Sequence, residues 1–289
     1  MPLLHQFEKV SSLLNLIKFS HTIFSLPFAI MSTFLAANGM PEIRQLLLII
    51  AALVAARGAA MSFNRLVDKN YDMLNPRTRY RAVLLNKIGK KNIWLFTTLN
   101  VMLVITFAWL LNKLAFYMSP IAILIIFGYS YTKRFTYLSH VVLGLALALS
   151  PLGAWIAIKG TLSVTPLLLA LAVILWTGGF DIVYACQDME FDTKIGLYSI
   201  PKRFGIRGAL IISGILHFLM VLVLVIIPVY TDLRLIYKIG VCITGALLFY
   251  EHSLVKPKDL SKVNTAFFTI NGIISLGLMG VTLIDIFLT

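Results

Sequence analysis

The chain has 289 residues, of which 59% are hydrophobic and only 13% are charged, and its formal net charge at pH 7 is +13. Soluble globular domains carry about 25% charged residues, so this composition excludes an ordinary soluble domain and predicts a membrane protein embedded in a lipid bilayer. A basic chain can bind nucleic acid, but here the cations lie in short segments between apolar runs without a recognisable nucleic-acid-binding module, so no nucleic acid partner is expected.

Apolar runs of about 20 residues, long enough to cross a hydrocarbon core of roughly 30 Å, follow one another along the chain. They cover residues 17–38, 43–66, 93–112, 114–132, 138–158, 164–186, 208–230, 233–254 and 265–287. No linker or change of composition divides them. We therefore expect an all-α polytopic membrane protein, with a single domain over 1–289 and about nine transmembrane helices around a central cavity.

The basic residues indicate the orientation of these helices. Most of them precede the first run or follow the second, fourth, sixth and eighth runs, and cytoplasmic loops are enriched in such cations. The opposite face carries only Arg44, Lys113, Lys159, Arg234 and Lys238. We expect a cytoplasmic N-terminus, cytoplasmic cap loops at about 67–92 and 187–207, and, since the N-terminus lacks transit-peptide character, a bacterial inner membrane.

The first acidic motif begins at the end of the second apolar run. Asn64, Asp68 and Asp72 are spaced four residues apart, which places all three side chains on one face of a helix. Two carboxylates at this spacing repel each other, and burial near a membrane increases the cost. A positively charged partner is therefore expected opposite them.

The second acidic motif begins at the end of the sixth run and contains Asp181, Tyr184, Asp188 and Asp192, whose offsets of 0, 3, 7 and 11 again define one helical stripe. Five of the chain's 12 acidic residues lie in the two motifs. Sparse carboxylate ligands at helix ends suit Mg²⁺, which keeps several waters and is commonly shared with substrate phosphate.

Basic residues accompany both motifs, and one of them, Arg57, lies inside an apolar run seven residues before Asn64. The others nearest the motifs are Arg65, Lys133, Arg134, Lys194 and Lys202. Carboxylates that alternate with cations suit a diphosphate bridged by a metal ion. Arg57 can instead snorkel to the interface, and the loop cations would be basic for topology in any case.

The two motifs together resemble those of the UbiA superfamily of intramembrane prenyltransferases, and the resemblance covers essentially the whole chain. The first matches the family's N-x-x-x-D-x-x-x-D, followed by NPRT at 75–78, and the second matches D-x-x-Y-x-x-x-D-x-x-x-D-x-K-x-G. IKFSHTIFSLPFA at 17–29 is similar to the branch of 4-hydroxybenzoate polyprenyltransferases and their menaquinone-pathway relatives. RAVLLNKIG at 81–89 departs from the family, which usually has a Pro-x-x-x-Gly turn there.

The resemblance implies Mg²⁺-dependent transfer of a polyprenyl group from polyprenyl diphosphate to an aromatic acid, with 4-hydroxybenzoate as first choice, in respiratory quinone biosynthesis. The implied metal ligands are Asn64, Asp68, Asp188 and Asp192. The implied catalytic residues are Asp72, Asp181, Arg57, Lys133 and Arg134. The implied substrate-binding residues are Lys18, Arg65, Tyr184, Lys194 and Lys202.

Three alternatives remain open on the sequence. A naphthoate of menaquinone biosynthesis is a second possible acceptor. A cation-coupled secondary transporter also uses rare intramembrane charges, although its sites usually lie near the midplane at broken helices. A CDP-alcohol phosphotransferase would bind Mg²⁺ and a diphosphate with spaced aspartates, but its Asp-Gly-x-x-Ala-Arg opening is missing here.

Overall fold

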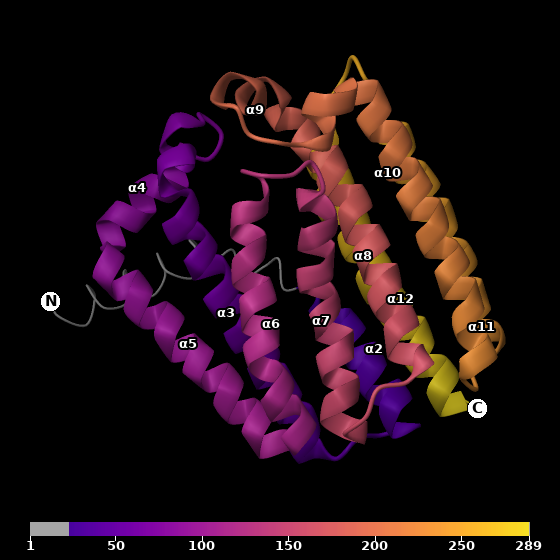
Figure 1. Cartoon of the computed structure of the whole chain (residues 1–289). Helices are drawn as coiled ribbons and strands as arrows, with labels where there is room; N and C mark the ends of the chain where they lie inside the picture. Colours follow the sequence, from indigo (N-terminus) through magenta and orange to yellow (C-terminus); the bar gives the residue numbers. More distant parts are fainter. Residues whose placement is uncertain (1–22, 289) are drawn as a thin grey trace, which may run out of the picture.

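A computed structural model describes residues 23–288, and within that range long helices stand side by side (Figure 1). They are α2 (Leu26–Ala37), α3 (Ile43–Leu74), α5 (Lys90–Leu111), α6 (Lys113–Thr132), α7 (Ser139–Lys159), α8 (Val164–Ala185), α10 (Ile200–Ile226), α11 (Leu235–Leu254) and α12 (Asn271–Leu288). Shorter elements are α4 (Arg79–Ile88), α9 (Met189–Ile195), the 3₁₀ helices η2 (Cys186–Asp188) and η3 (Ile227–Tyr230), and the π-helix η4 (Thr265–Ile270).

Seven helices of the described range are long and apolar enough to cross a membrane, namely α3, α5, α6, α7, α8, α10 and α12. The described part of α2 is shorter, with 12 residues. Helix α11 carries Lys238 near its start and Glu251 near its end, and it is not among the seven. The described part of the chain is thus all-helical, and the protein is a multi-pass membrane protein. The long helices coincide with most of the apolar runs identified in the sequence.

The long helices form a closed circuit in which neighbours in sequence are neighbours in space. Helix α3 contacts α5, and α6, α7, α8, α10, α11 and α12 follow, each in contact with the one before it. Helix α2 contacts α12, α7 and α3 and so joins the two ends of the circuit. An aromatic core lies where α2, α8 and η4 meet, with Phe28 and Trp176 fully buried at ring centroids 5.2 Å apart.

The two segments expected as cap loops, 67–92 and 187–207, are largely helical in the structure. Helix α3 continues past residue 66 to Leu74, since the next helix breaker is Pro76, and proline disfavours helical backbone in the residue before it. Helix α10 begins early, with Pro201 in its first turn and the Ser199 hydroxyl accepting a hydrogen bond from the backbone N–H of Lys202. It bends at Gly205, whose φ of 69° suits glycine.

Candidate active site

The first acidic motif lies entirely on α3, as its spacing predicts. Asn64 Nδ2 donates to Asp68 Oδ2 at 2.8 Å, and Arg65 Nη1 donates to Asn64 Oδ1 at 3.2 Å. Asp72 is buried, with one oxygen 3.8 Å from Arg65 Nη1 and the other 4.0 Å from Arg81 Nη1. The positive partners expected opposite these acids are therefore present.

The second motif does not form one continuous stripe, and that expectation is wrong beyond Ala185. Asp181 and Tyr184 lie on α8, but Asp188 ends the 3₁₀ helix η2 and Asp192 lies on α9. A 3₁₀ helix has about 3.0 residues per turn instead of 3.6, so the side chains after it no longer continue the face of α8. The acids of this motif are consequently held by different neighbours.

Asp188 is held by the turn that follows α3. Asn75 Nδ2 donates to its Oδ1 at 3.1 Å, and the Arg77 guanidinium forms a hydrogen-bonded ion pair with both oxygens. Arg77 Nη1 also donates to the Tyr184 hydroxyl at 2.7 Å. Burial lowers the pKa of Arg77, but its hydrogen bonds and attraction to Asp188 outweigh burial, so the pKa is raised above its ordinary value. The end of the first motif thus contacts the second.

The last turn of α6 and the residues after it join the two motifs a second time. Lys133 Nζ lies 2.9 Å from Asp192 Oδ1, and Arg134 Nη2 lies 3.3 Å from Asp68 Oδ1. Both carboxylate oxygens of Asp192 are buried without a hydrogen bond, so the ion contact with Lys133 is what balances their charge. Two consecutive cations therefore bring an acid from each motif together.

The four expected metal ligands are not gathered into one coordination shell. Among the described residues, no group of three or more His, Cys, Asp or Glu side chains is placed to hold a metal ion. Asn64 and Asp68 touch, whereas Asp188 pairs with Arg77 and Asp192 with Lys133. The oxygen donors nevertheless fit Mg²⁺ in kind, and Asp192 Oδ2 is a buried acceptor without a hydrogen bond.

An apolar cavity of about 370 Å³ lies between α2, α3, α5, α6 and α7. Arg57 and Tyr129 are among the few polar side chains that line it, and Arg57 Nε is buried without a hydrogen bond. Tyr129 lies near Arg57, Arg65 and Asp68. The cavity therefore combines apolar walls with a buried cation that lies on α3, about two helical turns before the first acidic motif.

The remaining expected residues have varied surroundings. Lys18 lies outside the described residues. Lys194 is exposed on α9, and Lys202 Nζ donates to the Leu197 carbonyl at 2.8 Å. Asp181 Oδ2 lies 2.7 Å from His140 Nδ1.

Four residues of this region were absent from the expected site, namely Asn75, Arg77, Tyr129 and His140. Asn75 and Arg77 belong to the NPRT segment, which the sequence marks as part of a motif without giving its residues a role. Tyr129 lies four residues before Lys133, on the last turns of α6. Helical spacing alone places it near that lysine, and this was the available signal.

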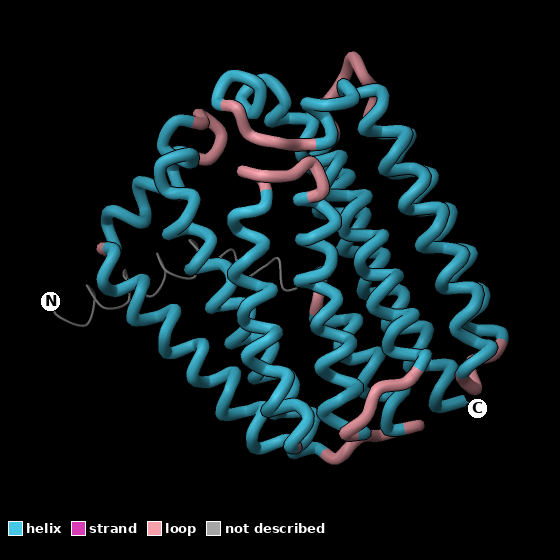
Figure 2. The backbone as a smooth tube through the Cα atoms, viewed as in Figure 1, coloured by secondary structure: helices cyan, strands magenta, loops and turns pink. Residues whose placement is uncertain are grey.

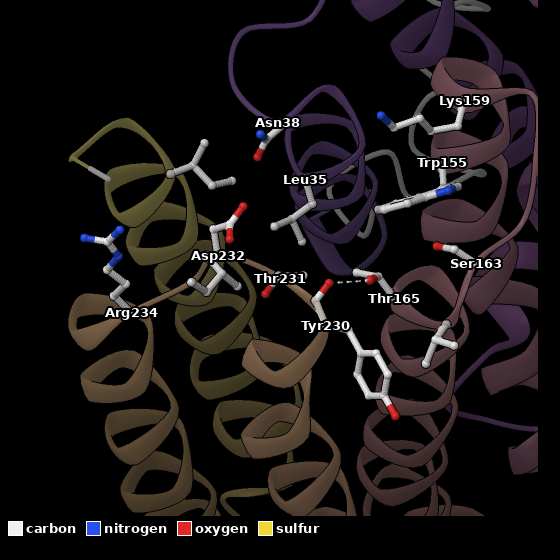
Figure 3. A pocket seen from close by; sticks show the side chains of 13 residues that line it. Leu35, Asn38, Trp155, Lys159, Ser163, Thr165, Tyr230, Thr231, Asp232 and Arg234 are labelled. Atoms are coloured by element: carbon white, nitrogen blue, oxygen red, sulfur yellow. Dashed lines mark hydrogen bonds between the residues drawn. The ribbon is translucent and has the colours of Figure 1, made fainter.

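A second cavity, of about 690 Å³, lies at the other end of the bundle, where α7 ends and α8 begins (Figure 3). Its charged lining residues are Lys159, Asp232 and Arg234, all exposed and of mixed sign. It contains one carboxylate and lies a full length of α8 from the second motif. It is therefore a poor candidate for binding a metal and a diphosphate.

The comparisons with known proteins agree with this geometry. The model of the UbiA prenyltransferase family matches residues 25–273. A 4-hydroxybenzoate octaprenyltransferase of Vesicomyosocius okutanii subsp. Calyptogena okutanii is 33% identical over 226 residues, which cover 78% of this chain and 82% of the relative. The apo structure of a UbiA homologue from Aeropyrum pernix K1 matches with a TM-score of 0.82 and 30% identity, over 91% of this chain and 97% of that one. A UbiA homologue from Archaeoglobus fulgidus bound to GPP and Mg²⁺ shares the fold, with a TM-score of 0.76 at 22% identity, over 95% and 99% of the two chains.

Proposed function

Because the chain belongs to the UbiA prenyltransferase family, we propose that it transfers a polyprenyl group from a polyprenyl diphosphate to 4-hydroxybenzoate, in the biosynthesis of respiratory quinones. The acceptor follows the name of the related octaprenyltransferases, at 30 to 33% identity. Membership of this family decides against the transporter and the phosphotransferase alternatives. A naphthoate remains the second candidate acceptor, and the same assay can test it.

One observation carries the proposal: two adjacent cations each contact an acid of a different motif. Arg134 pairs with Asp68 of the first motif, and Lys133 pairs with Asp192 of the second. A diphosphate needs cations, and a metal ion that bridges it needs carboxylates, so an array of acid–base pairs can exchange partners when such a ligand binds. Lys133 and Arg134 would turn to the phosphoryl oxygens, and Arg65 would add a third positive charge. Asp68, Asp188, Asp192 and Asn64 would then be released to hold Mg²⁺.

When bound, Mg²⁺ would neutralise charge on the diphosphate as the allylic C–O bond breaks. The apolar cavity excludes water, which protects an allylic cation from hydrolysis, and it accommodates the isoprenoid chain. The aromatic carbon ortho to the hydroxyl forms the new C–C bond. A carboxylate of the motifs, Asp72 or Asp181, accepts the proton that this carbon loses.

Arg57 is the residue we assign to the carboxylate of the aromatic acid. Its Nε is buried without a hydrogen bond at the wall of the apolar cavity, and a buried donor of this kind is stabilised by an anionic ligand. Tyr129 lines the same cavity and lies near both Arg57 and Asp68. The acceptor would thus lie between the cavity and the first motif.

We further propose that the protein resides in a bacterial inner membrane with the acidic motifs on the cytoplasmic side. The segments at that end of the bundle, after α3, α6, α8 and α11, carry most of the basic residues that the structure places outside the long helices. Positive charge at short loops favours the cytoplasmic side. A fusion reporter placed after α3 and one placed after α7 would test this orientation, because they should report opposite sides of the membrane.

The function is tested with membranes that contain the wild type, an Asp68→Asn/Asp188→Asn double variant, or a Glu190→Gln control that removes an exposed acid of α9. Each receives Mg²⁺, radiolabelled 4-hydroxybenzoate and an allylic polyprenyl diphosphate, and label extracted into organic solvent is counted. We expect transfer by the wild type and the control, and loss with the double variant or with EDTA. Transfer only to a labelled naphthoate would replace the acceptor, and no transfer to either would overturn the proposal.

A further inference from the structure

His140 stands at the start of α7 in contact with two other elements. Its Nδ1 lies 2.7 Å from Asp181 Oδ2 on α8, and its Nε2 accepts a hydrogen bond from the backbone N–H of Ile200, at the start of α10, at 3.4 Å. The side chain is 3% exposed. Because the Ile200 N–H can donate only to an unprotonated ring nitrogen, the proton of the imidazole resides on Nδ1 and points to Asp181.

The two linkers next to His140 lie side by side at the same end of the bundle, one between α6 and α7 and the other between α9 and α10 (Figure 2). The Tyr198 N–H of one linker donates to the Lys133 carbonyl of the other at 2.8 Å. The rings of Tyr137 and Tyr198 meet edge to face, with centroids 4.9 Å apart. The linkers are therefore packed as a unit, and each joins an element that His140 contacts.

This unit carries the cation and the acid that meet at the candidate diphosphate site. Lys133 begins the first linker, and Asp192 lies on α9, just before the second. Their contact at 2.9 Å depends on how the two linkers are placed relative to each other. His140 fixes the relative position of the two linkers, since its side chain hydrogen-bonds both to Asp181 on α8 and to Ile200 at the start of α10.

We propose that His140 is a positioning residue for the diphosphate end of the site, acting through Asp181 and Ile200 on the placement of Asp192 and Lys133. The inference rests on the proposed function, because the ligand that it positions is the polyprenyl diphosphate. His140 does not touch the reacting atoms. Its loss changes how well the diphosphate binds, and its role needs one hydrogen-bond donor and one acceptor but no ionisable ring.

The test compares purified variants in detergent or in vesicles. His140→Leu removes both hydrogen bonds, whereas His140→Gln retains an amide donor and an amide acceptor without a titratable ring. Ser139→Ala is the matched control, because Ser139 is the adjacent buried polar residue of α7 and its hydroxyl has no hydrogen-bond partner. For each variant, kcat and KM are measured with varied polyprenyl diphosphate, together with binding of a non-reacting allylic thiolodiphosphate in the presence of Mg²⁺.

We expect His140→Leu to raise KM for the diphosphate and to weaken thiolodiphosphate binding by about tenfold. His140→Gln should return both values to within about threefold of the wild type, and Ser139→Ala should leave them unchanged. Equal KM values for the wild type and the Leu variant would overturn the inference, as would a Gln variant no better than Leu.

His140→Asn serves if the Leu variant does not fold. Its amide takes the place of Nδ1 and keeps the bond to Asp181, but it is too short to reach Ile200. An intermediate KM is therefore expected, and a wild-type KM would contradict the proposal.

The proposed function and the role of His140 fail in different ways. A wild type without transferase activity removes the proposed function and this inference with it, whereas an active wild type with unaffected His140 variants removes the inference alone.

Discussion

The two acidic motifs have similar spacing in the sequence but different structures. The first lies on one uninterrupted helix, α3, and Asp68 is paired with Arg134 at side-chain exposures of 30% and 25%. The second is broken by a 3₁₀ turn, and its last carboxylate, Asp192, is fully buried. Helix α3 also carries Arg57, whose Nε has no hydrogen bond, whereas the Asp192 carboxylate of the second motif has an ion contact with Lys133 but no hydrogen bond. From this difference we expect the second motif to bind the metal more tightly and the first motif to contact the acceptor.

The largest effect is expected from removing one charge from each motif. Asp192→Asn should lower kcat/KM by about 10³-fold and Asp68→Asn by about 10²-fold, within the range known for single electrostatic groups of an active site. Asp192 should matter more because its carboxylate is fully buried, where solvent screens its attraction to a cation least. Steady-state rates at saturating Mg²⁺ provide the measurement. A larger loss with Asp68→Asn would reverse the comparison.

The next effect concerns the acceptor. Arg57→Leu should raise KM for the aromatic acid by about 30-fold, or about 2 kcal/mol, and should leave KM for the polyprenyl diphosphate within about threefold. The reason is the position of Arg57 on the wall of the apolar cavity, away from the paired cations that follow α6. Varying each substrate separately distinguishes the two constants. Equal increases in both would place Arg57 at the diphosphate instead.

The stability of the two ion pairs should differ as well. Lys133→Met leaves the Asp192 carboxylate buried and unpaired, and should destabilise the protein by about 2 kcal/mol, less than the 3–5 kcal/mol known for fully buried pairs, because Lys133 is 35% exposed. Arg134→Met should cost about 0–1 kcal/mol, since both members of its pair are partly exposed. Unfolding in detergent micelles measures both. Asp192→Asn added to Lys133→Met should restore stability, and no restoration would argue against the unpaired charge as the cause.

The smallest effect is expected at the other end of the bundle. Lys159→Ala and Asp232→Asn change charged residues of the larger cavity, which lies far from both motifs. Transferase activity should stay within about twofold of the wild type, because these groups are exposed and solvent screens their charges. The radiolabel assay described above is sufficient. A loss of more than tenfold would show that this cavity takes part in the reaction.

The sequence by itself determined the class of the protein, most of its helix positions and the residue types of the site. Apolar runs of membrane-spanning length permit few structures other than helices, because backbone polar groups in lipid must be satisfied within the segment. The spacing of Asn64, Asp68 and Asp72 fixed their common face, since nothing breaks the helix before Pro76. These features depend on local chemistry and so are visible in a single sequence.

Only the tertiary structure decided which acid meets which base. Asp192 pairs with Lys133, and Asp188 with Arg77, across separations of roughly 60 and 110 residues that helical periodicity does not relate. In the sequence His140 is an isolated histidine, and only the folded chain brings Asp181 and Ile200 to its two ring nitrogens. Such contacts are set by how α6, α7, α8 and α10 pack. Packing of that kind depends on the shapes of many side chains at once, whereas spacing depends on one helix alone.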